Sequence, residues 1–166
     1  MIEAITFDFW NTLYKLPGPG LAEIRAQGVR EVLLAGGYEF GLEQLLEAFR
    51  HSWQKAFDQQ RNEGIDIGPW GHVELILKKL NLSVNDNLKE ELFQSYTGAL
   101  LQAPPELNND VLDTLPRLVP KFKLAVICNT GVTPGKTLRK LMEDDGIFKF
   151  FSHTTFSDET IFSKPD

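Results

Sequence analysis

The sequence predicts an α/β fold in which a parallel β-sheet is covered by helices and a bundle of helices is inserted after the first strand. Three observations support this prediction. Short apolar runs that end in polar turns occur near both ends of the chain, a segment with helical spacing joins the last two runs, and the long stretch 15–105 has hardly any strand signal. With 166 residues, 42% of them apolar, the chain can bury about one domain core.

Three segments are predicted to be strands. They are Ile2–Asp8, Phe122–Cys128 and His153–Phe156. The first two lead into turns that contain Asn11 and Asn129. Runs that are apolar on both faces are typical of parallel strands with helices on both sides of the sheet, so we expect a three-layer core.

Two helices are expected beside these strands. The stretch Thr133–Asp144 lies between the second and third strands and has Pro134 near its start, which predicts a right-handed β-α-β unit. The stretch Asn108–Val119 predicts another helix before the second strand. Pro116 should kink that helix or end it early, because proline cannot donate a backbone hydrogen bond.

The inserted stretch predicts a small bundle of four amphipathic helices. Their expected ranges are Leu21–Leu34, Leu42–Arg61, Trp70–Leu80 and Leu88–Leu101. Segments rich in proline at residues 17–20 and 103–105 are typical of hinges. The expected organisation is therefore a core made of residues 1–14 and 106–166, with residues 15–105 as an inserted helical cap.

Composition excludes several classes of function. The formal net charge is −6, from 17 Lys and Arg against 23 Asp and Glu, so the surface repels a nucleic-acid backbone. The single Cys128 cannot form an internal disulfide, the first residues do not resemble a signal peptide, and no apolar run approaches the roughly 20 residues needed to cross a bilayer. We expect a cytoplasmic protein that binds neither nucleic acid nor a membrane. A homodimer is one alternative for its oligomeric state.

Polar and charged residues follow each predicted strand. Asp8 ends the first strand, Asn129 follows the second, and the pair Ser157 and Asp158 follows the third, shortly before Lys164. Because the carboxyl ends of parallel strands meet at one edge of a sheet, we expect these side chains to share one crevice. A lysine beside Asp8 would keep that carboxylate ionised and aimed, which suits a covalent nucleophile.

Three motifs in this order resemble those of the haloacid dehalogenase-like (HAD) hydrolases. They are FDFWNTL at residues 7–13, ICNTG at 127–131 and KPD at 164–166, with the helical insert between the first and second. The resemblance covers the whole chain and implies a Rossmann-like core with a helical-bundle cap. It also implies that Asp8 attacks the substrate to form an aspartyl ester or aspartyl phosphate, which water then hydrolyses.

The resemblance implies roles for further residues. Thr12 and Asn129 would hold loop backbone and substrate oxygens, and Lys164 would offset the negative charge at the nucleophile. Thr130 and Cys128 would lie at the substrate. Cys128 stands where relatives carry a serine or threonine whose hydroxyl bonds a substrate oxygen, and a thiol is a weaker donor.

The residue type at Trp10 distinguishes between two reactions of this family. Phosphatases of this family carry a second aspartate at this position, which protonates the leaving alkoxide, and an indole cannot do so; such help is worth roughly 10²- to 10⁴-fold. Members that hydrolyse carbon–halogen bonds carry an aromatic residue there, because a halide leaves without a proton. The leading hypothesis is therefore hydrolysis of a small anionic substrate such as a 2-haloacid, without a cofactor. The alternative is a phosphatase whose Mg²⁺ is held by Asp8 and the main-chain carbonyl of Trp10.

The end of the chain departs from the family pattern. The chain stops at Asp166, before the family's fourth motif, whose acidic residues bind magnesium or orient water. Stopping there should leave the strand before Asp8 as an edge of the sheet, so we expect either a piece of a longer protein or a partner that covers the edge. A non-catalytic binding protein of this fold is an alternative of another class. In the loop that delivers Lys164, Ile161 stands where relatives often have glycine.

Each core candidate also has a structural interpretation. The alternatives are a turn or helix cap for Asp8, Thr12 and Asn129, a solvated charge for Lys164, and an inert core residue for Cys128. The three histidines show no spacing typical of metal ligands.

The insert contributes candidates of its own. Arg25 and Arg30 either grip an anionic substrate or lie on the surface of a helix. Phe49, Trp53 and Phe57 recur at a spacing typical of a bundle core. Trp70 is a candidate for packing between the cap and the core.

Overall fold

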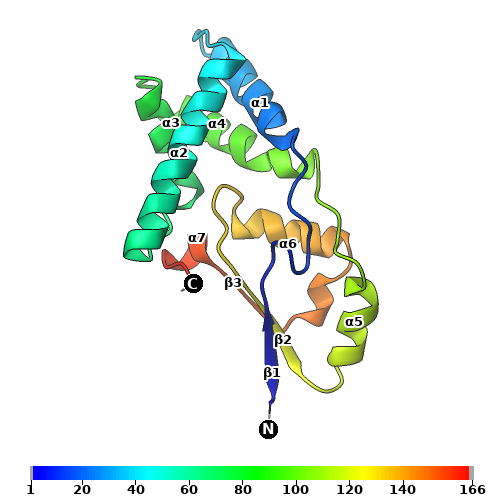
Figure 1. Ribbon diagram of the computed structural model, residues 1–166. Helices are drawn as coiled ribbons and strands as arrows, with labels where there is room; N and C mark the ends of the chain where they lie inside the picture. Colours follow the sequence, from blue (N-terminus) through cyan, green and yellow to red (C-terminus); the bar gives the residue numbers. More distant parts are fainter. Residues whose placement is uncertain (1, 165–166) are drawn as a thin grey trace.

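The three strands pair as one parallel sheet. The computed structural model describes residues 2–164 and contains β1 (Ala4–Phe7), β2 (Lys123–Cys128) and β3 (His153–Phe156) in the order β1-β2-β3 (Figure 1). Phe7 pairs with Val126 and Cys128 pairs with Phe156, so all three strands end at the same edge. Within residues 2–164, β1 pairs with β2 alone and its other side is an edge, as predicted.

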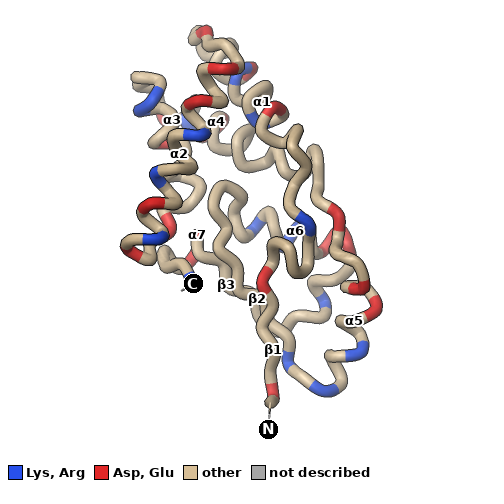
Figure 2. The backbone as a smooth tube through the Cα atoms, viewed as in Figure 1, with Lys and Arg blue, Asp and Glu red and all other residues tan. Residues whose placement is uncertain are grey.

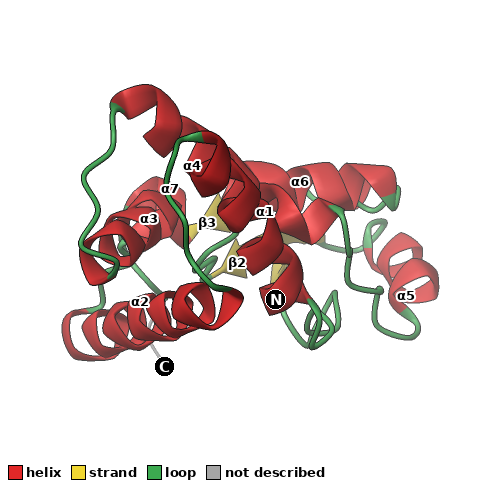
Figure 3. Ribbon diagram, turned by 90° about the horizontal axis from the view of Figure 1, so that it is seen from above, coloured by secondary structure: helices red, strands yellow, loops and turns green. Residues whose placement is uncertain are grey.

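Two helices pack on one face of this sheet. α5 (Val111–Leu118) and α6 (Gly135–Asp144) lie on the same side of the strands in Figures 1 and 3. Ile127, which points to the opposite face of β2, is 37% exposed. The alternation follows from the two-residue period of a strand. The β2 side chains buried against the helices are Leu124, Val126 and Cys128.

The residues between β1 and β2 hold four helices with a core of their own. They are α1 (Leu21–Ala35), α2 (Leu42–Glu63), α3 (Gly68–Lys79) and α4 (Asp86–Gly98), and the 3-10 helix η1 (Ala99–Leu101) follows α4. α1 packs on α4 and α2, and α2 packs on α3. Their buried side chains form a cluster separate from that under the sheet, and it includes Leu33, Leu45, Phe49, Ile76 and Leu92.

The two segments that join these helices to the sheet run side by side. The backbone N–H of Lys15 donates to the carbonyl of Glu106 at 2.9 Å, and that of Asn108 donates to the carbonyl of Leu13 at 2.9 Å. Tyr14, between them, is buried, and its hydroxyl donates to Asp145 after α6 at 2.9 Å. The helical insert therefore leaves and re-enters the sheet region at one place.

The predicted fold class and all nine predicted helices and strands are confirmed, with differences at their ends. The helix expected over Leu88–Leu101 starts two residues earlier and closes as 3-10. Pro116 lies inside α5, which ends two residues later. Two short elements, η2 (Phe148–Phe150) and α7 (Ser157–Thr160), have too few residues to show a period and were not predicted.

Positively and negatively charged residues are spread along the helices and loops (Figure 2). Within residues 2–164, no helix is long and apolar enough to cross a membrane.

Gly135 allows α6 to lie close to β3. A Cβ atom built on Gly135 would come within 2.6 Å of the ring of Phe156, the last residue of β3, and Phe156 is fully buried. Only a residue without a side chain fits at this contact, because a buried ring in a packed core has no room to retreat.

We predict that Gly135→Ala lowers the free energy of unfolding by about 1–3 kcal/mol, because the added methyl overpacks this contact. Gly18→Ala is the matched control, since a Cβ atom there meets nothing within 4 Å. Urea unfolding of both variants measures the difference. Equal stability of the two variants would contradict the close approach.

Candidate active site

Asp8 and Lys164 meet at the carboxyl edge of the sheet. Asp8 is the first residue after β1, and its Oδ1 lies 2.7 Å from the Nζ of Lys164. The two side chains are 43% and 31% exposed. An ion pair as open as this contributes only about 0–1 kcal/mol to stability, so its importance is the positive charge it places beside the carboxylate. Pro165 and Asp166, the rest of the third motif, lie outside the described residues.

One oxygen of the Asp8 carboxylate is unpaired within residues 2–164. The backbone N–H of Phe9 donates to Oδ1 at 2.7 Å, and Lys164 pairs with the same atom. Within residues 2–164, Oδ2 forms no hydrogen bond or ion pair. Two donors on Oδ1 hold the side chain in place while the lone pairs of Oδ2 stay available to an electrophile.

Asn129 holds the loop that carries Lys164. Its side-chain Oδ1 accepts a hydrogen bond from the backbone N–H of Lys164 at 2.9 Å. Because Asn129 directly follows β2, the end of β2 positions the lysine next to the end of β1. The structure therefore brings three of the predicted residues together, and a contact between Asn129 and a substrate oxygen stays a prediction.

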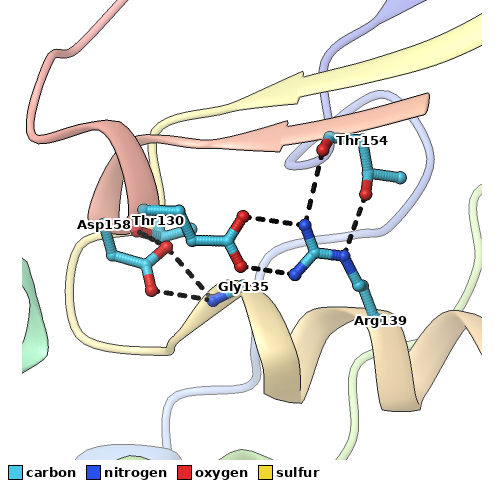
Figure 4. A network of polar contacts seen from close by, with 6 residues as sticks. Thr130, Gly135, Arg139, Thr154 and Asp158 are labelled. Atoms are coloured by element: carbon cyan, nitrogen blue, oxygen red, sulfur yellow. Dashed lines mark hydrogen bonds and ion pairs between the residues drawn. The ribbon is translucent and has the colours of Figure 1, made fainter.

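Asp158 anchors the loop after β2. Its carboxylate accepts from the Thr130 hydroxyl at 3.1 Å and from the backbone N–H of Gly135 at 3.2 Å (Figure 4). Burial raises the pKa of Asp158, and these hydrogen bonds oppose that rise. Next to it, Arg139 of α6 binds Glu159 and the Thr154 hydroxyl. Asp158 and Thr130 thus connect α7 to the start of α6. The hydroxyl of Thr130 is a donor in this contact.

The helical cap is joined to the same loops. The hydroxyl of Ser157 donates to Asp66, in the segment between α2 and α3, and accepts from the backbone N–H of Thr130 at 2.9 Å. Asp66 and Ser157 are both buried. The backbone N–H of Ser163 also donates to the carbonyl of Gly64 at 2.9 Å. The C-terminal loop with Lys164 is therefore held between the cap and the sheet edge.

Two hollows open near the carboxyl edge of the sheet, and Asp8 is not among the residues that line either of them. The first, of about 320 Å³, lies between the loops of the sheet edge and the cap. The second, of about 430 Å³, reaches Lys164. Asn129 and Gln60 line both, so the hollows adjoin. The first hollow is lined by Trp10, Leu16, Pro17, Leu21, Arg25, Trp53, Gln60 and residues 129–133.

The prediction that Trp53 and Phe57 belong to the bundle core is wrong. Both are about half exposed, at 49% and 53%, and they line the hollows, whereas Phe49 is buried in the bundle as predicted. The reason is the length of α2: its buried residues end at Ser52, and its second half extends past the other helices toward the sheet edge (Figure 1). The sequence carried a signal for this, since the helix expected at 42–61 is the longest of the four.

Gln60 and Arg61, on the same part of α2, were not identified from the sequence. Both line the hollow at Lys164. Trp70 stacks on Phe93 of α4 at 3.9 Å, so it packs within the cap and not between the cap and the core.

Arg25 and Arg30 lie in different environments. Arg25 is buried, where its guanidinium donates to the carbonyl of Tyr96 at 3.2 Å and to the Thr133 hydroxyl at 3.1 Å, and it borders the first hollow. The alternative prediction, that Arg25 is a charge on the surface of a helix, is therefore wrong. Arg30, five residues further along the helix, faces another direction, and its Nε donates to the carbonyl of Phe40 at 3.2 Å. Arg30 does not line these hollows, which favours the alternative of a charge on the surface of a helix.

Two further candidates stand apart from the hollows. Cys128 is buried in the core under the sheet, and burial raises the pKa of its thiol, which favours the alternative of an inert core residue over a contact with substrate. Thr12 is exposed, and its carbonyl accepts from the Asn108 side chain at 3.1 Å. This contact places Thr12 at the junction of the two connecting segments.

Ile161 adopts a strained backbone conformation in the loop before Lys164. Its φ is +62°, in the left-handed region that β-branched residues avoid. The side chain is 60% exposed, so its packing contributes little free energy to offset this strain. The carbonyl of Ile161 accepts from the N–H of Asp66 at 3.0 Å, which ties the strained residue to the cap. Ile161 therefore replaces the glycine that relatives often have at a position whose backbone conformation favours glycine.

We predict that Ile161→Gly raises the free energy of unfolding by about 0.5–1 kcal/mol, because relief of the left-handed strain exceeds the added entropy of the unfolded chain. Ile127→Gly, at a partly exposed site with an extended backbone, is the control and should lower stability. Chemical denaturation reports both changes. A loss of stability in Ile161→Gly would show that the side chain matters more than the backbone.

A buried histidine lies behind the site. His72 is almost fully buried, and its Nδ1 lies 3.2 Å from the Oγ of Ser52. The Ser52 hydroxyl donates to the Phe49 carbonyl at 2.9 Å, so its single proton is used and His72 donates from Nδ1 as the neutral ring. Burial lowers the pKa of His72 to about 4, and the nearby Asp66 carboxylate only partly opposes this.

This burial makes the stability of the protein pH-dependent. The folded protein keeps His72 neutral between pH 6.5 and 4, whereas the unfolded chain binds a proton there, so stability falls as the pH falls. We predict that the wild type loses about 3 kcal/mol more than His72→Gln between pH 7 and pH 4. Urea unfolding at several pH values measures this difference, with His153→Gln as a control that removes an exposed ring. Parallel pH profiles for wild type and His72→Gln would contradict the assignment.

The described residues do not by themselves make a magnesium site. Within residues 2–164, no three His, Cys, Asp or Glu side chains are placed to hold a metal ion. Mg²⁺ prefers an octahedron of oxygen ligands, and the phosphatase alternative names two of them here, Asp8, whose Oδ2 is unpaired within residues 2–164, and the main-chain carbonyl of Trp10. These two donors do not complete an octahedron, and magnesium binding stays a prediction.

Fold and site together define an α/β protein with a helical cap and an aspartate–lysine pair between the two parts. No family model and no curated protein matches the sequence. Solved structures do match. The 2-haloacid dehalogenase from Pseudomonas syringae pv. tomato DC3000 gives a TM-score of 0.63 at 18% identity, over 100% of this chain and 68% of that chain.

Two further structures match over 99% of this chain. YfnB from Bacillus subtilis, described as a HAD-hydrolase bound to magnesium, gives a TM-score of 0.60 at 18% identity and is covered over 69% of its length. A protein from Haemophilus somnus 129PT, described as a predicted phosphoglycolate phosphatase, gives a TM-score of 0.51 at 17% identity and is covered over 65% of its length. The chain thus has the fold of the HAD-like hydrolases and spans about two thirds of the length of these structures.

Proposed function

We propose that this protein is a hydrolase in which the Asp8 carboxylate is a covalent nucleophile toward a small anionic substrate, with 2-haloacid hydrolysis as the leading reaction. The observation that carries the proposal is the 2.7 Å contact between Asp8 and Lys164 at the edge where three parallel strands end. The likeness in fold to dehalogenases and phosphatases supports it by analogy.

The chemistry follows from the two oxygens of Asp8. Oδ2 attacks the carbon that bears the halogen, and a C–O bond forms as the carbon–halogen bond breaks and the halide leaves with its electron pair. Water then adds to the carbonyl carbon of the aspartyl ester, and the acyl C–O bond breaks. The hydroxy acid leaves with the former Oδ2, and the released proton passes to solvent. Throughout, Lys164 on Oδ1 offsets the charge of the carboxylate.

Trp10 favours the carbon–halogen bond over a phosphate ester. Its ring lines the first hollow and packs edge-on against Phe9 with ring centroids 4.8 Å apart. An indole provides an apolar wall but no transferable proton, and a halide is a weak base that needs none. The same position is therefore suited to one leaving group and unsuited to an alkoxide.

The hollow at Lys164 favours an anion. Its lining includes two cations, Lys164 and Arg61, and no carboxylate. Ser163 lines it too, but its hydroxyl oxygen is buried. Lys164 is paired with Asp8, whereas Arg61 forms no ion pair within residues 2–164, so Arg61 supplies the positive charge that attracts a carboxylate from solution.

We predict that Asp8→Asn lowers kcat for 2-haloacids at least about 10³-fold, because the amide oxygen is a poor nucleophile. Asp113→Asn, on the exposed face of α5, is the matched control and should retain activity. Halide release, followed with 2-bromopropanoate, measures both variants. Equal activity of wild type and Asp8→Asn would exclude the mechanism.

Isotope labelling tests the covalent step directly. In a single turnover in H₂¹⁸O, the label should enter Asp8 and not the product, since water attacks the acyl carbon of the ester. Label in the product alone would indicate direct attack by water. Turnover of phosphate esters that requires magnesium, without halide release, would instead support the phosphatase alternative.

A further inference from the structure

We infer that the substrate carries an extended apolar chain, which lies in a groove between α1 and α2 while its anionic end lies at Lys164. The inference rests on the proposed function for the location of the reacting end. It goes beyond it by naming the chemical class of the substrate as a medium-chain aliphatic acid substituted beside the carboxylate.

The groove is large and mostly apolar. It encloses about 650 Å³ between α1 and α2, within the 300–1,000 Å³ typical of small-molecule sites. Trp53 and Phe57 on its wall are both about half exposed, and exposed aromatic side chains gathered at one hollow are unusual on a soluble protein. The lining residues are Ala22, Glu23, Arg25, Leu46, Phe49, Arg50, Trp53, Gln54, Phe57 and Tyr96.

The groove continues into the reacting cleft. Arg25 and Trp53 line both the groove and the first hollow. Asn129 and Gln60 line both the first hollow and the second hollow, which reaches Lys164. The indole of Trp53 lies over Gly131, where a Cβ atom would be 3.6 Å from the ring. Three adjoining hollows therefore lead from the lysine along α2 into the cap.

The charges along this path are arranged for a molecule with one anionic end. Lys164 and Arg61 lie at the sheet end. At the cap end, Arg50 is paired with Glu43 at 2.7 Å, whereas the buried guanidinium of Arg25 donates to neutral oxygens of Tyr96 and Thr133 and has no ion-pair partner within residues 2–164. Arg25 lies where the groove meets the first hollow, and Glu23 in the groove wall would repel a second anionic group. The groove therefore suits an uncharged chain.

Size also favours a chain over a short acid. A two- or three-carbon haloacid placed at Lys164 would leave the 650 Å³ groove without an occupant. A chain that reached past Trp53 would remove its own apolar surface and that of two aromatic rings from water. Such a substrate gains binding energy at a distance from the reacting carbon.

The first test is the dependence of kcat/KM on chain length, from 2-bromopropanoate to 2-bromodecanoate. We expect kcat/KM to rise by up to about fourfold for each added methylene, which is the factor for burying one CH₂ group. Ala22→Trp, which fills the groove from an exposed position on α1, should flatten this rise. Ala35→Trp, also at an exposed position on the same helix but absent from the groove lining, should retain it.

The second test needs no turnover. Calorimetry with decanoate and acetate should show that only decanoate binds measurably, and that Ala22→Trp weakens this binding at least tenfold. If decanoate binds as expected but no haloacid is hydrolysed, the groove assignment stands and the proposed reaction fails. A flat chain-length series together with equal binding of decanoate and acetate would overturn the inference. So would a dimer that Ala22→Trp dissociates in sedimentation, since the groove would then hold a second copy of the chain.

Discussion

The parallel pairing of β1, β2 and β3 is the constraint on which the rest of this structure depends. Strands that run in the same direction deliver their following loops to one edge, so residues more than a hundred positions apart become neighbours. Asp8 after β1, Asn129 after β2 and Lys164 in the loop after β3 meet only for this reason. The ion pair itself is exposed and contributes little to stability, so the stability of the arrangement comes from the sheet and the loops that hold it.

Those loops are held by polar contacts that are distinct from the reacting pair. Asp158 binds the start of α6 and the loop after β2, and Ser157 binds Asp66 from the cap. Within residues 2–164, Oδ2 of Asp8 takes no part in these contacts, because other carboxylates hold the loops. The same contacts fix the cap over the sheet edge, so the long helix α2 brings Trp53, Phe57 and Gln60 to the hollows. In the proposed function, the sheet edge therefore supplies the reacting groups and the cap supplies the walls of the substrate site.

Sequence reasoning succeeded where a local rule applies. Apolar runs predicted the strands, 3.6-residue periods predicted the six longer helices, and strand ends predicted the location of the candidate site. It failed where the environment of a side chain depends on distant elements. Trp53 and Phe57 have the spacing of a core face, but they lie beyond the ends of the helices that would have covered them. Arg25 and Arg30 look alike in sequence, and the positions of Tyr96 and Thr133 distinguish the buried one.

Residue identity and spacing along the chain were enough to predict the order of strands and helices, the motif residues and the absence of a proton donor at Trp10. The folded structure was needed to show that Oδ2 of Asp8 is unpaired within residues 2–164, that Cys128 is hidden in the core, that Ile161 is strained, and that a groove extends from the hollows into the cap. These features arise from contacts between segments far apart in the chain. Such contacts are set by packing in three dimensions, which no local pattern encodes.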